Sequence, residues 1–260
     1  MKLRIRFTKH GAVRYIGHLD MQRYFQRANR RAGLKVVYSE GFSPHQRMSF
    51  AMPLSVGYES DAEYFDLELS DAVSSGDIIQ RLNDQMTDGI EVTDCVRIPD
   101  DCENAMASVR AAAYSIEIKD GYETALDLKK AVTDLRSSGS FMIKKPVKPG
   151  KKRTKIKKAS YNTKTMEGGD TVTEDDPDHT VTEIRHLIFE ADIDQDGAMH
   201  LFMSAGSKDN VRPDLVLAAM FEKEGLSFDM TPFRITRTEL YTEDGPDGRL
   251  IPLIEAGEHF

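Results

Sequence analysis

The sequence predicts an α+β protein made of two tandem ferredoxin-like units, each with the element order β-α-β-β-α-β, the second carrying a basic insertion. Three observations favour this class. Alternating apolar and polar residues indicate short strands, apolar residues at every third or fourth position indicate helices, and the two patterns follow one another in the same order twice. At 260 residues, 40% of them hydrophobic, the chain is long enough for two such units.

The first unit is predicted over residues 1–100. Its opening strand, KLRIRF at residues 2–7, alternates apolar with basic side chains, so one face of the strand should be apolar and the other cationic. An amphipathic helix follows over residues 18–32 and ends at Gly33. The remaining elements are an extended segment around the loop GFSPHQR, a strand at 62–69, a helix near 76–87 and a strand at 90–98.

The second unit is predicted over residues 105–245, with a C-terminal tail at 246–260. Its elements are a strand at 108–118, a helix at 122–139, a hairpin over 184–204 that turns at Asp196 and Gly197, a helix that begins at Pro213 and a strand at 233–241.

An insertion near residues 144–183 interrupts the second unit. Its start, KKPVKPGKKRTKIKK, has nine basic residues and no acidic one, and EGGDTVTEDDPDHT further along is polar and acidic. This composition predicts a basic arm followed by a linker. Within the arm, Lys151, Lys152 and Arg153 are candidates for binding the phosphates of a nucleic acid.

The charge is distributed very unevenly along the chain, whose net charge is −8. Residues 1–59 hold eleven Lys or Arg against three Asp or Glu, about +8, which leaves about −16 for the remainder. A basic region in an acidic molecule selects where a polyanion binds. The candidate nucleic-acid-binding residues of this region are Arg4, Arg6, Arg14, His18, Arg23, Arg27, Arg30, Arg31, His45 and Arg47. The alternative is that these arginines form a solvated face.

Several classes of site are not expected. Cys95 and Cys102 do not form a cluster motif, and neither phosphate-binding glycine motif nor G-x-S-x-G occurs. DIDQDG at 192–197 has Met203 where a calcium loop needs a glutamate. We therefore expect no bound metal and no cofactor. With no apolar segment of membrane-spanning length, the sequence predicts a cytoplasmic protein without a membrane partner.

Two histidines in the basic region are weak candidates for catalysis. Imidazole moves protons near neutral pH, and a histidine beside arginines that hold a phosphodiester is a minimal arrangement for metal-independent RNA cleavage. His18 and His45 both qualify. However, His18 stands at the start of a predicted helix, where a structural role is an equally simple interpretation.

Long strings of the sequence resemble a bacterial family of radical-SAM-associated proteins, a domain of unknown function. They are RIRFTKHGAVRYIGHLD, RANRRAGLKVVYSEGFSPHQRMSFAMPLSVGYES and AEYFDLEL in the first unit, and GSKDNVRPDLVLAAM and ITRTELY in the second. The resemblance implies a radical SAM protein as partner, which would itself hold the iron–sulfur cluster and S-adenosylmethionine. It also implies a role in RNA or ribosome metabolism.

Together these observations predict a non-catalytic accessory partner of a radical SAM enzyme that binds or presents an RNA substrate. Two alternatives remain open. In the first, the basic face docks an acidic surface of the partner without touching RNA; in the second, the chain is a metal-independent RNA endonuclease. Salt-dependent RNA binding distinguishes the first alternative, and cleavage of RNA without metal distinguishes the second.

Overall fold

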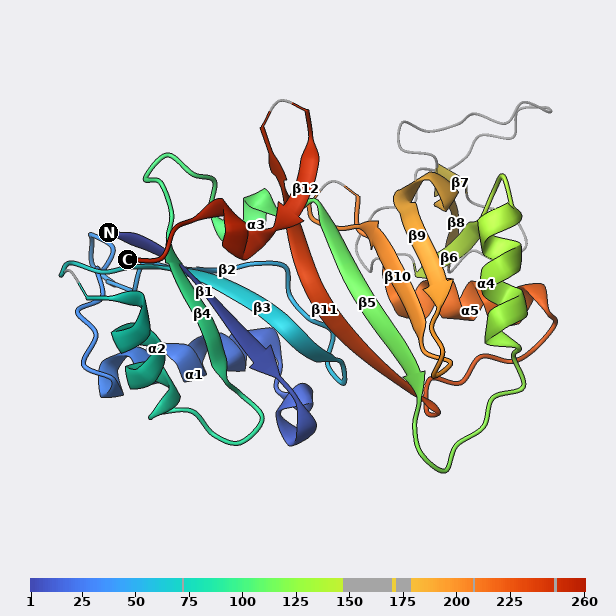
Figure 1. The fold of residues 1–260 in the computed structure, drawn as a ribbon, viewed down its shortest axis with the longest axis horizontal. Coiled ribbons are helices and arrows are strands. Elements are labelled where there is room, and N and C mark those ends of the chain that lie inside the picture. Colours follow the sequence, from blue (N-terminus) through green and yellow to red (C-terminus); the bar gives the residue numbers. More distant parts are fainter. Residues whose placement is uncertain (72, 147–169, 172–178, 208, 246) are drawn as a thin grey trace.

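The computed structural model describes residues 1–71, 73–146, 170–171, 179–207, 209–245 and 247–260. These residues form a mixed α+β fold with one mostly antiparallel sheet of nine strands and a second sheet of three (Figure 1). The predicted α+β class is therefore confirmed, whereas the division into two ferredoxin-like units stays a prediction. Lys151, Lys152 and Arg153 lie outside the described residues.

The large sheet has the strand order β4-β1-β3-β11-β5-β10-β9, with β2 beside β3 and β12 beside β11. Its strands are β1 (Lys2–Lys9), β2 (Met48–Phe50), β3 (Glu59–Glu68), β4 (Val92–Arg97), β5 (Ala111–Ile118), β9 (Ile188–Ile193), β10 (Met199–Ser204), β11 (Phe233–Asp244) and β12 (Arg249–Pro252). The small sheet consists of β6 (Met142–Pro146), β8 (His179–Glu183) and β7 (Asp170–Thr171), in that order.

The helices lie close to the predicted positions except for the short α3, which was not predicted and includes Ser108 of the strand predicted at 108–118. They are α1 (His18–Arg31), α2 (Ser75–Asn83), α3 (Ala105–Ser108), α4 (Leu128–Ser137) and α5 (Pro213–Lys223), with short 3-10 turns η1 (Gly11–Tyr15), η2 (Arg185–Leu187) and η3 (Leu253–Ala256). The helix expected from residue 122 begins only at Leu128. The reason is local: the Asp127 side chain accepts a hydrogen bond from the Lys130 N–H and caps the helix there.

Two hydrophobic clusters lie against the large sheet. In the first half, Phe25 of α1 and Ile78 of α2 pack against apolar residues of β1 and β3. In the second half, Val132 of α4 and Leu217 of α5 pack against β5, β10 and β11. The halves join where β3 and β11 run side by side in parallel, at the pairs Thr236 with Glu59 and Arg237 with Ser60.

The cationic face expected for the first strand is covered. Leu3, Ile5 and Phe7 of β1 are buried in the cluster with α1 and α2, and the period of two turns Arg4 to the opposite face. There Arg4 has no exposed surface, because the Leu253 carbonyl of η3 and the Glu103 carbonyl accept its hydrogen bonds. Alternation along a strand fixes which residues share a face, but not what covers that face.

The C-terminal residues beyond 246 return to the first half of the molecule. After β12 and η3, Glu258 pairs with Arg97 of β4, and the carbonyl of Phe260 accepts the Ser75 N–H at 2.9 Å. Both ends of the chain consequently lie at the same end of the molecule (Figure 1). The predicted tail is thus a segment that packs on the fold and covers part of it.

Candidate nucleic-acid interface

A row of arginines runs along the outer side of α1. Because successive residues of an α-helix turn by about 100°, Arg23, Arg27 and Arg30 share one side, directly opposite the buried Phe25. All three are exposed. Arg23 pairs with Asp20 at 3.2 Å, whereas Arg27 and Arg30 form no ion pair within the described part of the chain. We call these three residues the α1 arginine row.

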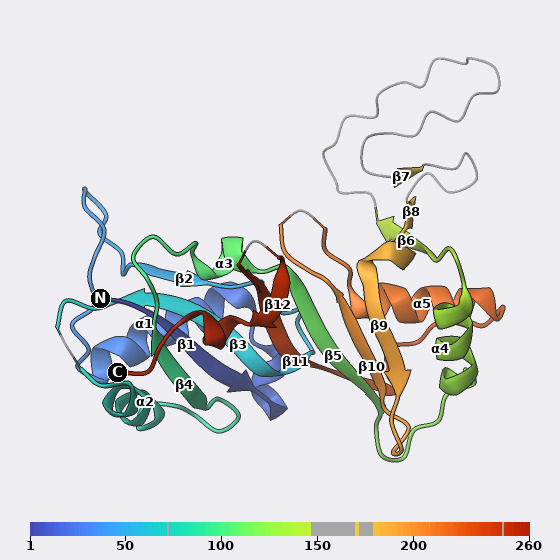
Figure 2. The same ribbon diagram turned by 45° about the horizontal axis from the view of Figure 1, so that its top comes forward.

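A loop with exposed aromatic side chains stands beside this row. The backbones of Tyr38 and Gln46 pair, and the chain between them projects from the molecule (Figure 2). At its tip Gly41 has a φ of 108°, a conformation that favours glycine, and Phe42 next to it is fully exposed. Tyr38 is 45% exposed. Exposed rings of this kind are suited to stacking on unpaired bases.

Two buried amides hold the loop against α1. The Asn29 side-chain amide of α1 donates to Gln46 Oε1 at 3.0 Å, and Gln46 Nε2 donates to the Gln26 carbonyl of α1 at 3.0 Å. Asn29 and Gln46 are both almost completely buried. The base of the loop is therefore fixed on the helix that bears the α1 arginine row.

Other predicted residues flank the interface and are already paired. Arg31 donates to the carbonyl and side chain of Gln85, and Arg47 pairs with Glu68 at 3.1 Å. His45 lies in the exposed loop, where its Nδ1 is 2.8 Å from Ser39 Oγ. These contacts orient the side chains while leaving them on the surface.

The structure does not bring the β1 arginines to this surface. Arg4 is bonded through Nε to Asp66 at 2.9 Å, and Arg6, on the same face of the sheet, pairs with Glu239 of β11 at 3.1 Å. α1 covers the opposite face of β1. Of the predicted interface of strand, helix and loop, only the helix and the loop therefore remain. Arg14 lies apart from both and pairs with Glu59 at 2.8 Å.

His18 faces the interior and not the α1 arginine row. Its ring contacts the ring of Phe50 edge-on, with centroids 5.6 Å apart. Burial lowers the pKa of His18, and the nearby charge of Lys9 acts in the same direction against the opposite effect of Glu63. A neutral half-buried imidazole on a phenyl ring is well suited to a structural role at the helix start.

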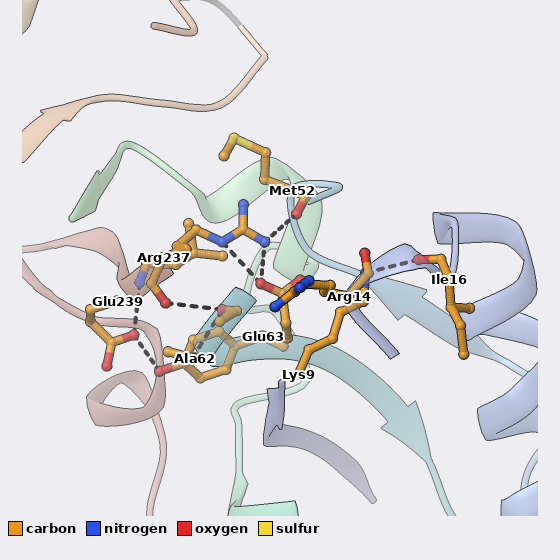
Figure 3. Close-up of polar contacts among 11 residues, drawn as sticks. Lys9, Arg14, Ile16, Met52, Ala62, Glu63, Arg237 and Glu239 are labelled. Carbon is orange, nitrogen blue, oxygen red and sulfur yellow. Dashed lines mark hydrogen bonds and ion pairs between the residues drawn. The ribbon is translucent and has the colours of Figure 1, made fainter. Parts of the chain in front are cut away.

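Sequence reasoning missed a buried charge cluster where the two halves meet. Arg237 of β11 is completely buried, and Figure 3 shows its guanidinium between the carboxylate of Glu63 and the carbonyl of Met52, at 3.0 and 2.9 Å. Lys9 lies nearby, donates to the carbonyl of Ile16 at 2.8 Å, and has its pKa lowered mainly by burial. The one available signal was a basic residue inside the strand pattern FRITRTELY.

Two further findings concern the described residues only. No group of three or more His, Cys, Asp or Glu side chains among them is arranged to hold a metal ion. None of the helices that the structure describes is long and apolar enough to cross a membrane.

Comparison with known proteins gives a family without an assigned activity. A model of a family described as uncharacterized proteins conserved in bacteria, DUF2344, matches residues 2–213. No curated protein matches the chain significantly. The matched range contains α1, the loop that carries Tyr38 and Phe42, and the residues Asn29 and Gln46 that join loop and helix.

Proposed function

The chain belongs to the bacterial protein family DUF2344, and we propose that it is a non-catalytic RNA-binding partner of a radical SAM enzyme in the cytoplasm. The RNA-binding surface in this proposal consists of the α1 arginine row and the loop that carries Tyr38 and Phe42. The radical SAM subunit would carry the iron–sulfur cluster and S-adenosylmethionine and perform the chemistry. The link to that subunit rests on the sequence resemblance described above.

One observation carries the proposal: buried hydrogen bonds anchor the base of the loop that bears the fully exposed Phe42 to α1, the helix that bears Arg27 and Arg30. Arg27 and Arg30 lack an acidic partner in the described residues, so they can neutralise phosphates without first breaking an ion pair. Phe42 exposes its whole ring to water, so an unpaired base can stack on it. A single-stranded RNA can bind both kinds of group, because its phosphates pair with guanidinium groups and its unpaired bases stack on the phenyl ring.

We also propose that each half of the large sheet is a ferredoxin-like unit. The first half has the order β4-β1-β3-β2 and the second β11-β5-β10-β9. In both, the four strands alternate with two helices as β-α-β-β-α-β once the segment between α4 and β9 is set aside. This repetition supports the division at about residues 100–105.

The test is RNA binding as a function of salt, measured by fluorescence anisotropy with single-stranded RNA. Replacing Arg23, Arg27 and Arg30 together by Ala should weaken binding and make it less dependent on salt. For single strands the slope of log affinity against log salt falls by roughly 0.7 per lost phosphate contact, so a reduction of up to about 2 is expected.

The matched control removes three exposed cations elsewhere, Lys129, Lys130 and Arg136 of α4, by the same change to Ala. It should leave affinity and salt slope close to those of the unchanged protein. Equal losses in both variants would show non-specific attraction, and absence of binding at low salt would favour docking of the basic face to a protein. RNA shortened during the incubation would contradict a non-catalytic role and direct attention to His18 and His45.

A further inference from the structure

A pocket of about 310 Å³ lies where the two halves of the sheet meet, at the edge opposite the chain ends. Its volume is at the lower end of the range of about 300–1,000 Å³ for small-molecule sites. Four segments contribute to it: η1, the loop before β3, the end of β5, and β11 with the loop before it. We call it the seam pocket. The residues on which the argument rests are Arg14, Tyr15, Val56, Tyr58, Lys119 and Arg234.

The charged side chains that line the seam pocket are all cationic. Lys119 Nζ donates to the carbonyl of Thr231 at 2.7 Å and forms no ion pair in the described part of the chain, although hydrogen bonds from Thr231 and the nearby charge of Lys119 together lower the pKa of the Asp229 carboxylate. Arg234 reaches Glu117 only at 3.5 Å, and its Nε is buried without a hydrogen-bond partner among the described residues. Arg14, which also pairs with Glu59 at 2.8 Å, completes the set. An anion bound here would meet three positive groups from three different segments.

The rest of the lining is apolar and aromatic. Tyr15 is 64% exposed and Val56 61% exposed, although both stand at a concave site. The guanidinium carbon of Arg14 lies 5.0 Å from the centre of the Tyr15 ring. Tyr58 forms a fixed wall, because its hydroxyl donates to Asp214 at 2.8 Å. A flat ring could therefore be held between apolar side chains beside the cations.

We propose that the seam pocket binds the terminal, phosphate-bearing nucleotide of an RNA strand. This inference rests on the proposed RNA-binding function and adds the position at which the end of the RNA strand binds. The base would stack at Tyr15, and the terminal phosphate would contact Lys119 and Arg234. In the sequence only Ile16 and Gly17 separate η1 from α1, so in this proposal a strand leaving the pocket continues toward the helix that bears the α1 arginine row.

Charge distinguishes a terminal phosphate from the internal ones. A phosphomonoester carries nearly two negative charges at neutral pH, since its second pKa is about 6, whereas an internal phosphodiester carries one. A pocket with three cations therefore favours the strand end over any internal position. The preference should fall as the pH decreases through about 6 and the monoester loses its second charge.

The experiment compares three versions of one ten-nucleotide RNA: a 5′-phosphate, a 3′-phosphate, and hydroxyl groups at both ends. The label is attached to a central base, and affinity is measured at pH 7.5 and pH 5.5. At pH 7.5 one phosphorylated version should bind at least about fivefold more tightly than the hydroxyl version, as expected for one or more added charge-assisted contacts. Which version it is identifies the end that is bound.

Replacing Lys119 and Arg234 together by Gln should remove this preference, so that the three RNAs bind the variant with equal affinity. Tyr15→Ala, a change at an exposed side chain, should weaken binding of the phosphorylated version, and thermal unfolding checks that each variant is folded. Equal affinity of the unchanged protein for all three RNAs would overturn the seam pocket and leave the proposed function in place. Failure to bind any RNA would overturn both.

Discussion

Arg237 places a positive charge in the interior, where it is held by few contacts. Its guanidinium bonds to Glu63 and to the carbonyl of Met52, and its Nη1 has no hydrogen-bond partner among the described residues. Burial is the largest influence and opposes the charge, but the carboxylate of Glu63 and the hydroxyl of Tyr114 together outweigh it and raise the pKa of Arg237. The guanidinium therefore stays charged and depends on Glu63 for compensation.

Removing Glu63 should be strongly destabilising. Glu63→Ala leaves the charge of Arg237 buried and unpaired, which typically costs about 3–5 kcal/mol of the free energy of unfolding. Urea denaturation measures this loss. Replacing both partners, Glu63→Leu with Arg237→Met, should recover most of it, because neither charge remains.

The control is the exposed pair of Arg249 and Asp244, where Arg249→Ala should change stability by less than about 1 kcal/mol. A Glu63→Ala variant as stable as this control would mean that water reaches Arg237.

Whether a cation of β1 is buried in an ion pair or remains exposed depends on the residue opposite it in the neighbouring strand. Arg4 lies opposite Asp66 in the register of β1 and β3, and both are buried. Asp66 lies within the apolar pattern AEYFDLEL, and a carboxylate buried in such a pattern needs a cationic partner such as an arginine of KLRIRF. Without the strand register, the sequence does not show which arginine of KLRIRF is that partner. Composition identified the cations, but tertiary pairing decided which of them remain available to a ligand.

At the scale of elements, periodicity was a good guide wherever apolar residues recur. The strand and helix patterns of the sequence appear as β1, α1, β3, α2 and β4 in the first half, with ends shifted by a few residues. The loop at 38–46 carries no such pattern, and its position depends on Asn29 and Gln46. Two buried amides among polar neighbours cannot be recognised from spacing, so the relation of loop to helix was not predictable.

Loss of the Gln46 amide should release this loop from α1. Gln46→Ala leaves Asn29 Nδ2 without its oxygen acceptor, and a buried unsatisfied group typically costs about 1–3 kcal/mol. Limited proteolysis should then cut the variant between residues 39 and 45 faster than the unchanged protein.

Arg47→Ala, one residue further along and on the surface, is the matched control and should be cut at the original rate. Equal rates for all three proteins would show that the loop is not held by these amides.

For the whole molecule, the joining of two halves into one sheet lay beyond sequence reasoning. The parallel contact involves Glu59, Ser60, Thr236 and Arg237, polar residues that give no hydrophobic signal. The C-terminal segment adds a second connection, since it starts beside β11 and ends beside β4 and α2. We therefore expect the two halves to unfold together.

Gly257 tests the second connection. A Cβ at this position would come within 2.6 Å of the Arg97 carbonyl and of a Val96 methyl group, so the backbone must shift. Gly257→Ala should lower the free energy of unfolding by about 1–3 kcal/mol, as other overpacked sites do. Thermal unfolding followed by circular dichroism measures the change.

Gly76→Ala in α2 is the control, because a Cβ there has open space around it; it should be neutral or slightly stabilising. Equal melting temperatures for the two variants would mean that the C-terminal segment accommodates the added methyl group without loss of stability.

The covering of Arg4 by Leu253 has a consequence for synthesis on the ribosome. β1 and β3 emerge long before η3, and until η3 arrives the pair of Arg4 and Asp66 is contacted by Glu103 and Ala105 but lacks the carbonyl of Leu253. Over the same period β3 lacks β11 along part of its edge, and an unpaired strand edge is open to wrong partners. The nascent first half must wait in this state until η3 is translated, because Leu253 completes the packing around Arg4 of the first strand.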